Sequence, residues 1–240
     1  MRKITAFVAT LAMATMACPG FSQANADAMQ LLEQSTNFTK GLKTFYIDMS
    51  TTVSQGGQTM GVPMKIWAEM PDKMMMRMEG PSPTATYMVG TRMTSYISQM
   101  NQYMTMDLPA SPMKEMLTNG FTGMSGIGGA AAKPKEAKIV GQEVKNGTKT
   151  NHVKMTMPDG SEADLWIAEG AQPLPVFATM KMPQQQINTE AAMKWVVNQP
   201  IPAATFQFTP PPGATEMKVP ANQIPGAGAA PAGAGAPAKR

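Results

Sequence analysis

Alternating apolar and polar residues dominate the chain after residue 44 and predict β-strands. Phe45, Ile47 and Met49 alternate with polar neighbours, and the alternation resumes over residues 60–69 after Gly56-Gly57. A Gly-Gly pair between two such runs is a hairpin signal. Further short runs predict strands over residues 73–79, 85–89, 92–98, 102–106, 138–145, 150–157, 162–168, 174–182, 191–198 and 205–209. Asn146-Gly147 and Asp159-Gly160 are strong hairpin turns.

Two segments have helical features. Residues 27–42 place apolar side chains on one face, with Asp27 as N-cap and Gly41 near the end. Residues 112–117 predict a short second helix with Pro112 at its first position. The Gly-, Ala- and Ser-rich residues 120–133 that follow predict a mobile loop or lid.

About ten or eleven strands, two helices and no βαβ rhythm predict a mainly β (α+β) fold. We expect one large, curved antiparallel sheet whose concave face is apolar and is covered by the N-terminal helix and the short second helix. A long curved sheet with so few helices leaves a cavity, and such cavities hold apolar ligands.

The N-terminus resembles an export signal. Arg2 and Lys3 precede an uncharged, mostly apolar run, and Ala24–Ala26 offer a cleavage site. The sequence therefore divides into a signal peptide (1–26), one β domain (27–217) and a disordered Pro/Gly/Ala-rich tail (218–240). We expect a periplasmic or secreted protein without a transmembrane span. Lipidation at Cys18 is the alternative to cleavage after Ala26.

The number and placement of ionisable side chains argue against nucleic-acid binding, metal binding and enzyme activity. The net charge is +4, and no basic stripe would follow a phosphate backbone, so no nucleic-acid partner is expected. His152 is the only histidine and is expected to face water, while Glu162 and Asp164 suit an exposed strand face. No phosphate-binding loop or nucleophile motif occurs. We expect no catalytic residues, no metal, no cofactor and no enzyme activity.

Methionine takes the place of leucine. Residues 27–240 hold 23 of the 26 methionines but only seven leucines, and 16 of the methionines lie between Met49 and Met124. Methionine is flexible and polarizable, so it suits surfaces that adapt to varied apolar partners. By strand parity, the predicted cavity lining is Phe45, Ile47, Met49, Met64, Ile66, Met74, Met76, Met78, Met93, Met104, Met106, Val153, Met155, Leu165, Ile167, Met180 and Met182.

Two alternatives remain open. Thioethers select Cu(I), but Met74, Met76 and Met78 would stand about 7 Å apart along one strand. One ion would bridge them only with help from an adjacent strand. Trp67 and Trp166 fall on the polar side of their strands, which suits a sensor or interaction module that binds an envelope protein.

Three segments resemble a known family. Residues 70–78 (MPDKMMMRM) are similar to "RPDKxRxE", residues 165–175 (LWIAEGAQPLP) to "LWIDxxxxLP", and residues 206–214 (FQFTPPPGA) to "FxFxPPxGA". Together they resemble the LolA/LolB-like periplasmic lipoprotein carriers, most closely the DUF2092 predicted periplasmic branch, over residues 27–217.

The resemblance implies an open half-barrel with helices over its concave face and an apolar pocket between, which in relatives takes lipoprotein acyl chains. It therefore implies an exported carrier that binds a lipid or a lipid-modified protein. The chain departs from LolA-type carriers in its methionine enrichment, in its Pro/Ala-rich tail and in its arginines. Those carriers use an arginine inside the pocket, whereas Arg77 and Arg92 are the only arginines in this domain and the alternation places Arg77 outward.

Overall fold

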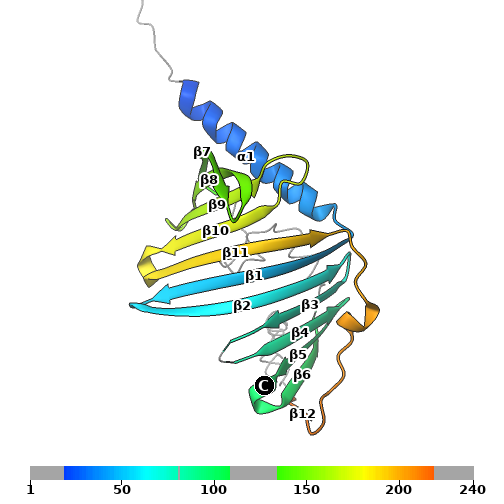
Figure 1. The fold of residues 1–240 in the computed structure, drawn as a ribbon. Helices are drawn as coiled ribbons and strands as arrows, with labels where there is room; N and C mark the ends of the chain where they lie inside the picture. The colour runs from blue at the N-terminus through cyan, green and yellow to red at the C-terminus, as the bar shows by residue number, and fades with distance from the viewer. Residues whose placement is uncertain (1–18, 81, 109–133, 219–240) are drawn as a thin grey trace, which may run out of the picture.

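The described part of the chain forms one twelve-stranded sheet accompanied by a long helix (Figure 1). A computed structural model describes residues 19–80, 82–108 and 134–218, with side chains from Asn25 onward. The elements are α1 (Pro19–Lys40), β1 (Thr44–Gln55), β2 (Gln58–Glu69), β3 (Lys73–Met78), β4 (Thr84–Val89), β5 (Arg92–Ile97), η1 (Ser98–Met100), β6 (Gln102–Asp107), β7 (Glu136–Lys145), β8 (Thr148–Thr156), β9 (Glu162–Ala168), β10 (Pro175–Met182), η2 (Pro183–Gln185), β11 (Ile187–Val197), η3 (Ala203–Phe206) and β12 (Thr215–Glu216).

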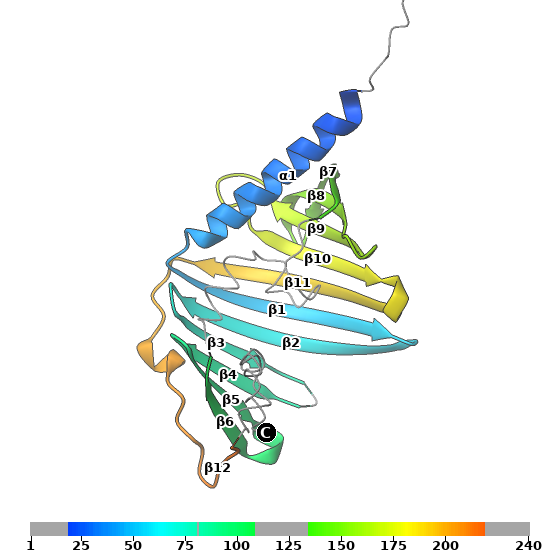
Figure 2. The same ribbon diagram turned by 180° about the vertical axis from the view of Figure 1, so that it is seen from behind.

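Two antiparallel meanders meet in the middle of the sheet. The strand order is β12-β6-β5-β4-β3-β2-β1-β11-β10-β9-β8-β7, so β1 to β6 follow one another on one side and β11 to β7 on the other. The long strands β1 and β2 pair along their whole length, and β11 pairs with the other side of β1. The sheet is open and curved, as the alternation and the resemblance predicted (Figures 1 and 2).

Two details of the predicted strands differ from the structure. Residues 205–209 do not form a strand, because η3 occupies residues 203–206 and the chain then runs extended over the sheet. The twelfth strand is instead β12, which pairs in parallel with β6. A strand of two residues is too short to leave an alternation pattern in the sequence.

The β7–β8 hairpin shows the turn chemistry that the sequence predicted. Asn146 and Gly147 have φ angles of 51° and 78°. Two successive positive φ angles define the type I′ turn that matches the twist of a two-residue hairpin, and Asn-Gly tolerates this conformation best.

Helix α1 begins earlier than the pattern suggested. It starts at Pro19 and continues through Asp27, so Asp27 is not the N-cap. Residues 21–26 contain neither Pro nor Gly, and nothing in them stops a helix. The side chain of Asn25 accepts a hydrogen bond of 3.0 Å from the backbone N–H of Ala137 on β7. Helix α1 therefore lies at the β7 end of the sheet (Figures 1 and 2).

Four predicted features lie outside the described residues. These are the leader up to Cys18, the second helix at 112–117, the loop or lid at 120–133, and the tail from residue 219 onward.

Candidate ligand-binding face

One face of the sheet, here called the inner face, carries the side chains that share the side of Phe45, Ile47 and Met49 on β1. Strand register arranges it in rows that cross neighbouring strands. From β11 to β6 these rows are Val197-Phe45-Ala68-Met74-Met88-Met93-Met106, Trp195-Ile47-Ile66-Met76-Thr86-Ser95-Met104 and Met193-Met49-Met64-Met78-Thr84-Ile97-Gln102. On the other side, Ala178, Leu165 and Val153 form one row and Met180, Ala163 and Met155 another.

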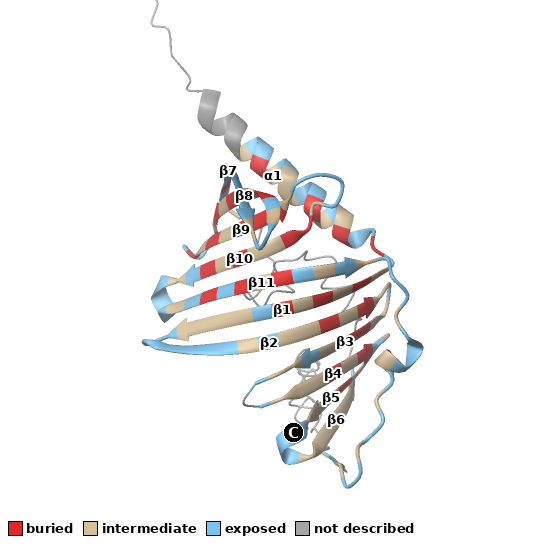
Figure 3. Cartoon of the chain, in the orientation of Figure 1, coloured by how far each residue is buried: buried red, intermediate tan, exposed pale blue. Residues whose placement is uncertain are grey.

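Every predicted lining residue lies on the inner face, but burial divides them into two groups. The buried group is Phe45, Ile47, Met49, Ile66, Met74, Val153, Met155, Leu165, Ile167 and Met180. The half-buried group is Met64, Met76, Met78, Met93, Met104, Met106 and Met182. Most of the half-buried group belongs to β2–β6, where Figure 3 shows intermediate burial over β5 and β6.

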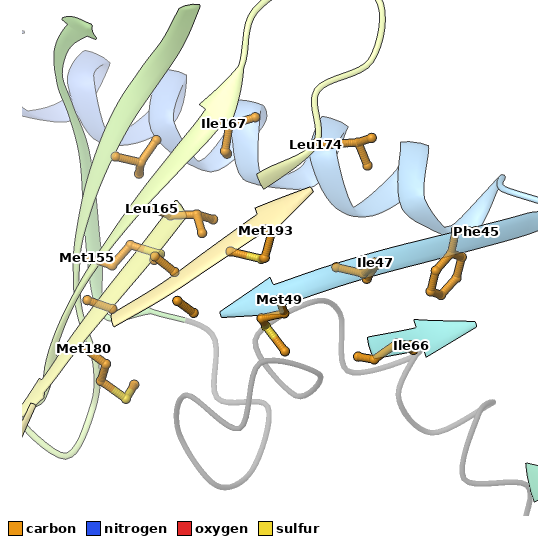
Figure 4. Packing of buried hydrophobic residues seen from close by; sticks show 14 of the residues in the cluster. Phe45, Ile47, Met49, Ile66, Met155, Leu165, Ile167, Leu174, Met180 and Met193 are labelled. Atoms are coloured by element: carbon orange, nitrogen blue, oxygen red, sulfur yellow. The ribbon is translucent and has the colours of Figure 1, made fainter. Parts of the chain in front are cut away.

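The β8–β11 part of the inner face, together with β1, is a closed hydrophobic core. Ala28 of α1 is fully buried in it, and Leu31, Leu32 and Phe38 of the same helix pack against it. Figure 4 shows how side chains of β1, β9 and β11 gather beside the helix. The side chains in this part therefore pack mainly against other residues of the chain.

The β2–β6 part differs in both burial and composition. Most of its methionines remain half-buried, although Met74 and Met88 are buried. A hydroxyl pair, Thr86 and Ser95, lies among them with 3.1 Å between the two oxygens. Across β1–β6, which are described throughout, the inner-face positions carry no ionisable side chain. This surface is therefore apolar with a small uncharged polar patch, and it has the groups to bind a hydrocarbon chain and no group for acid–base catalysis.

Strand parity alone had not nominated two buried inner-face residues, Met88 and Met193. Met88 shares its face with Thr84 and Thr86, so the apolar alternation of β4 is weak there. Met193 shares its face with Ala191 and Trp195 on β11, and this spacing was available in the sequence.

The opposite, outer face carries a compact polar and aromatic cluster on β7–β10. His152 Nε2 lies 2.7 Å from Asp164 Oδ1, and His152 Nδ1 lies 3.3 Å from Glu143 Oε1. The imidazole stacks on Trp166 with 4.2 Å between ring centroids. The expectation that His152 simply faces water is therefore wrong. So is the expectation of an exposed Asp164, because the side chains of this pair are each only 19% exposed.

Trp166 belongs to the same cluster and is only 7% exposed. Its indole N–H donates to Glu143, its ring meets Phe177 edge-on, and the Lys145 ammonium lies 4.5 Å from its centroid. Neighbouring side chains cover Trp166 on the outer face, which leaves it little surface for a partner. Trp67 is half-buried, and its ring centroid lies 5.0 Å from that of Tyr46.

The segment from β11 to β12 packs on the outer face of β3–β6. Phe208 places its ring 5.1–6.0 Å from those of Tyr87, Tyr96 and Tyr103. Phe206 is buried, and η3, which contains it, contacts β3 and β4. Met75, on the outer side of β3, is consequently buried although the alternation placed it outward. Arg77 is exposed, as the alternation predicted.

Comparison with known proteins identifies relatives by sequence and by structure. The profile of the family described as "Predicted periplasmic protein (DUF2092)" matches residues 28–219. No curated protein matches the chain.

Solved structures are similar to this chain at low sequence identity. An uncharacterized conserved protein from Thermus thermophilus is 8% identical, covers 80% of this chain and 98% of its own, and has a TM-score of 0.53. The lipoprotein LppX of Mycobacterium tuberculosis is 16% identical over 74% of this chain and 98% of its own, with a TM-score of 0.49. A LolA superfamily protein from Nitrosomonas europaea is 10% identical over 75% and 97%, with a TM-score of 0.42.

Membrane-spanning helices and clusters of metal-binding side chains are both absent from the described residues. No helix among them has the length and apolar character needed to cross a membrane. Within the same residues, no three or more His, Cys, Asp or Glu side chains gather in a way that would hold a metal ion.

Proposed function

The chain belongs to the DUF2092 family of predicted periplasmic proteins, and on that premise we propose that it is an exported carrier for an apolar ligand. The ligand is a lipid or the acyl chain of a lipid-modified protein. It lies along the inner face of β2–β6, and the role is binding rather than catalysis.

One observation carries this proposal. Six inner-face methionines of β2–β6 are only half-buried, although they continue an apolar surface that is largely buried over β8–β11: Met64, Met76, Met78, Met93, Met104 and Met106. Partly exposed apolar side chains that lie side by side mark surfaces that bind a partner or a ligand. The absence of ionisable groups among the inner-face positions of β1–β6 favours a hydrocarbon over a charged ligand.

The energies agree with a hydrocarbon ligand. Burying one methylene contributes about 0.8 kcal/mol. A long acyl chain therefore gains on the order of 10 kcal/mol before ordering costs, without any charged contact. Methionine side chains adjust their shape at low cost, so a wall of methionines accepts chains of different length and saturation.

Export follows from the same proposal. From Asn25 onward, where the side chains of α1 are described, Ala28 is the first residue buried in the core, and Ala26 and Asp27 are exposed. Cleavage after Ala26 would thus remove the beginning of α1, together with the hydrogen bond from Ala137 to Asn25, and leave the part of the helix whose apolar side chains pack on the sheet. Lipidation at Cys18 would instead keep the whole helix and add an anchor.

Mass spectrometry of the protein purified from its native envelope, without detergent, tests the proposal directly. We expect a stoichiometric adduct with the mass of a lipid, which organic solvent removes, on a chain that begins at Asp27. A protein that is adduct-free when isolated and that also fails to take up a fluorescent fatty acid would refute the carrier role. A chain that begins at a lipidated Cys18 would refute the cleavage site while leaving the carrier role intact.

A further inference from the structure

Four methionines form an unbroken row across the inner face of β3–β6. Met74 lies directly opposite Met88, Met88 opposite Met93, and Met93 opposite Met106. Neighbouring strands lie about 4.8 Å apart. Side chains that face one another across strands therefore approach far more closely than the about 7 Å between alternate residues on one strand.

Met74, Met76 and Met78 along β3 are too widely spaced to bind one ion together. The row instead brings together sulfur atoms from adjacent strands. Two rotatable bonds position a methionine sulfur relative to the backbone, so the outer members of a three-residue row can lean toward the central one. Met93 is central, with Met88 and Met106 on either side. Soft thioether ligands of this kind select Cu(I) among biological metals.

Methionine is the commonest residue on the inner face of β3–β6. The inner-face positions of β3–β6 hold Met74, Met76, Met78, Met88, Met93, Met104 and Met106, with Ile97 as the only branched aliphatic residue. On the other side of the sheet, the inner face of β8 and β9 instead uses Val153, Leu165 and Ile167 beside a single methionine, Met155. Methionines also occur in the buried core, but β3–β6 place them opposite one another on four successive strands.

The surroundings favour a soft monovalent ion. The inner-face positions of β1–β6 carry no carboxylate or imidazole that would attract Mg²⁺, Ca²⁺ or Zn²⁺. A neutral set of thioethers brings no charge repulsion of its own, and a single positive charge costs less to desolvate there than a double one. Met74 and Met88 are buried while Met93 and Met106 are half-buried, so the row extends from the core toward the accessible part of the face.

We propose that Met88, Met93 and Met106 bind one Cu(I) ion on the inner face, with Met74 completing the row. Binding is a ligand exchange without electron transfer. This site is additional to the carrier role, and because it uses the same wall, a bound acyl chain and Cu(I) compete for it.

Anaerobic titration of the purified full-length chain with Cu(I), in competition with a chromogenic Cu(I) chelator, tests the site. We expect one Cu(I) per chain, and X-ray absorption should show a first shell of sulfur alone. The triple variant Met88→Leu/Met93→Leu/Met106→Leu keeps side-chain volume and apolar character. It should lose at least tenfold in Cu(I) affinity while it keeps the circular dichroism spectrum of the parent chain.

The matched control replaces three buried methionines outside the row, Met75→Leu/Met157→Leu/Met193→Leu, and should retain Cu(I) affinity within twofold. Equal Cu(I) affinity in the parent chain and the row variant would overturn the proposal. A first shell of nitrogen or oxygen would do so as well. Neither result would contradict the carrier role, because fatty-acid binding is measured separately on the parent chain.

Discussion

Met49 of β1 lies directly opposite Met193 of β11, and the two side chains are 1% and 2% exposed. This pair joins the two meanders of the sheet at the centre of the core (Figure 4). The two residues are far apart in the sequence, so their contact forms only when β11 returns to β1.

Truncating this contact should destabilise the whole sheet. Met193→Ala removes a fully buried side chain, and such changes cost about 2–5 kcal/mol through lost burial and the cavity left behind. Urea unfolding followed by circular dichroism measures the effect. Met60→Ala is the matched control, because Met60 is 54% exposed and its loss should change the unfolding free energy by less than about 0.5 kcal/mol. Equal losses in the two variants would contradict the burial argument.

A charge on the inner face should abolish ligand uptake. Met76→Asp places a carboxylate among half-buried apolar side chains, where its desolvation opposes a hydrocarbon. We expect fluorescent fatty-acid affinity to fall by at least tenfold, measured by titration. Arg77→Asp places the same carboxylate one residue along β3 on the exposed outer face and should leave affinity within twofold. Unchanged uptake in a folded Met76→Asp variant would count against the carrier role.

The outer-face cluster should matter for stability but not for uptake. His152→Phe retains an aromatic ring against Trp166 and removes the hydrogen bond to Asp164. A partly buried carboxylate that loses its partner costs about 1–3 kcal/mol. Urea unfolding should show this loss, with fatty-acid affinity unchanged. Lys154→Ala, which removes a more exposed ion pair with Glu162, should change stability by less than about 1 kcal/mol.

The segment after β11 should stabilise β3–β6 by packing on their outer face. Phe208→Ala removes the ring that contacts three tyrosines, and we expect a loss of about 1–3 kcal/mol, since Phe208 is only half-buried. Hydrogen exchange should accelerate at β12 and β6, where Met217 N–H donates to the Tyr103 carbonyl over 2.7 Å. Gln207→Ala, at the exposed neighbouring position, is the control. Unchanged exchange in Phe208→Ala would show that the segment is not held through this ring.

Strand parity was readable from the sequence because it is a local property. Successive side chains on a strand point to opposite faces whatever the strand pairs with. Alternation therefore placed Phe45, Met76 and Leu165 on one face, although they lie on three different strands. Local turn chemistry likewise predicted the Asn146-Gly147 hairpin.

Burial and partnership were decided by the tertiary structure. Met155 and Met76 have the same residue type and the same parity, yet one is buried and the other half-buried. Three contacts depend on which strands become neighbours. They are the contact of His152 with Asp164, the packing of Phe206 and η3 on the β3 side of the outer face, and the alignment of Met88 with Met93. Pairing between distant segments is set by the packing of the complete sheet, and no window of the sequence contains it.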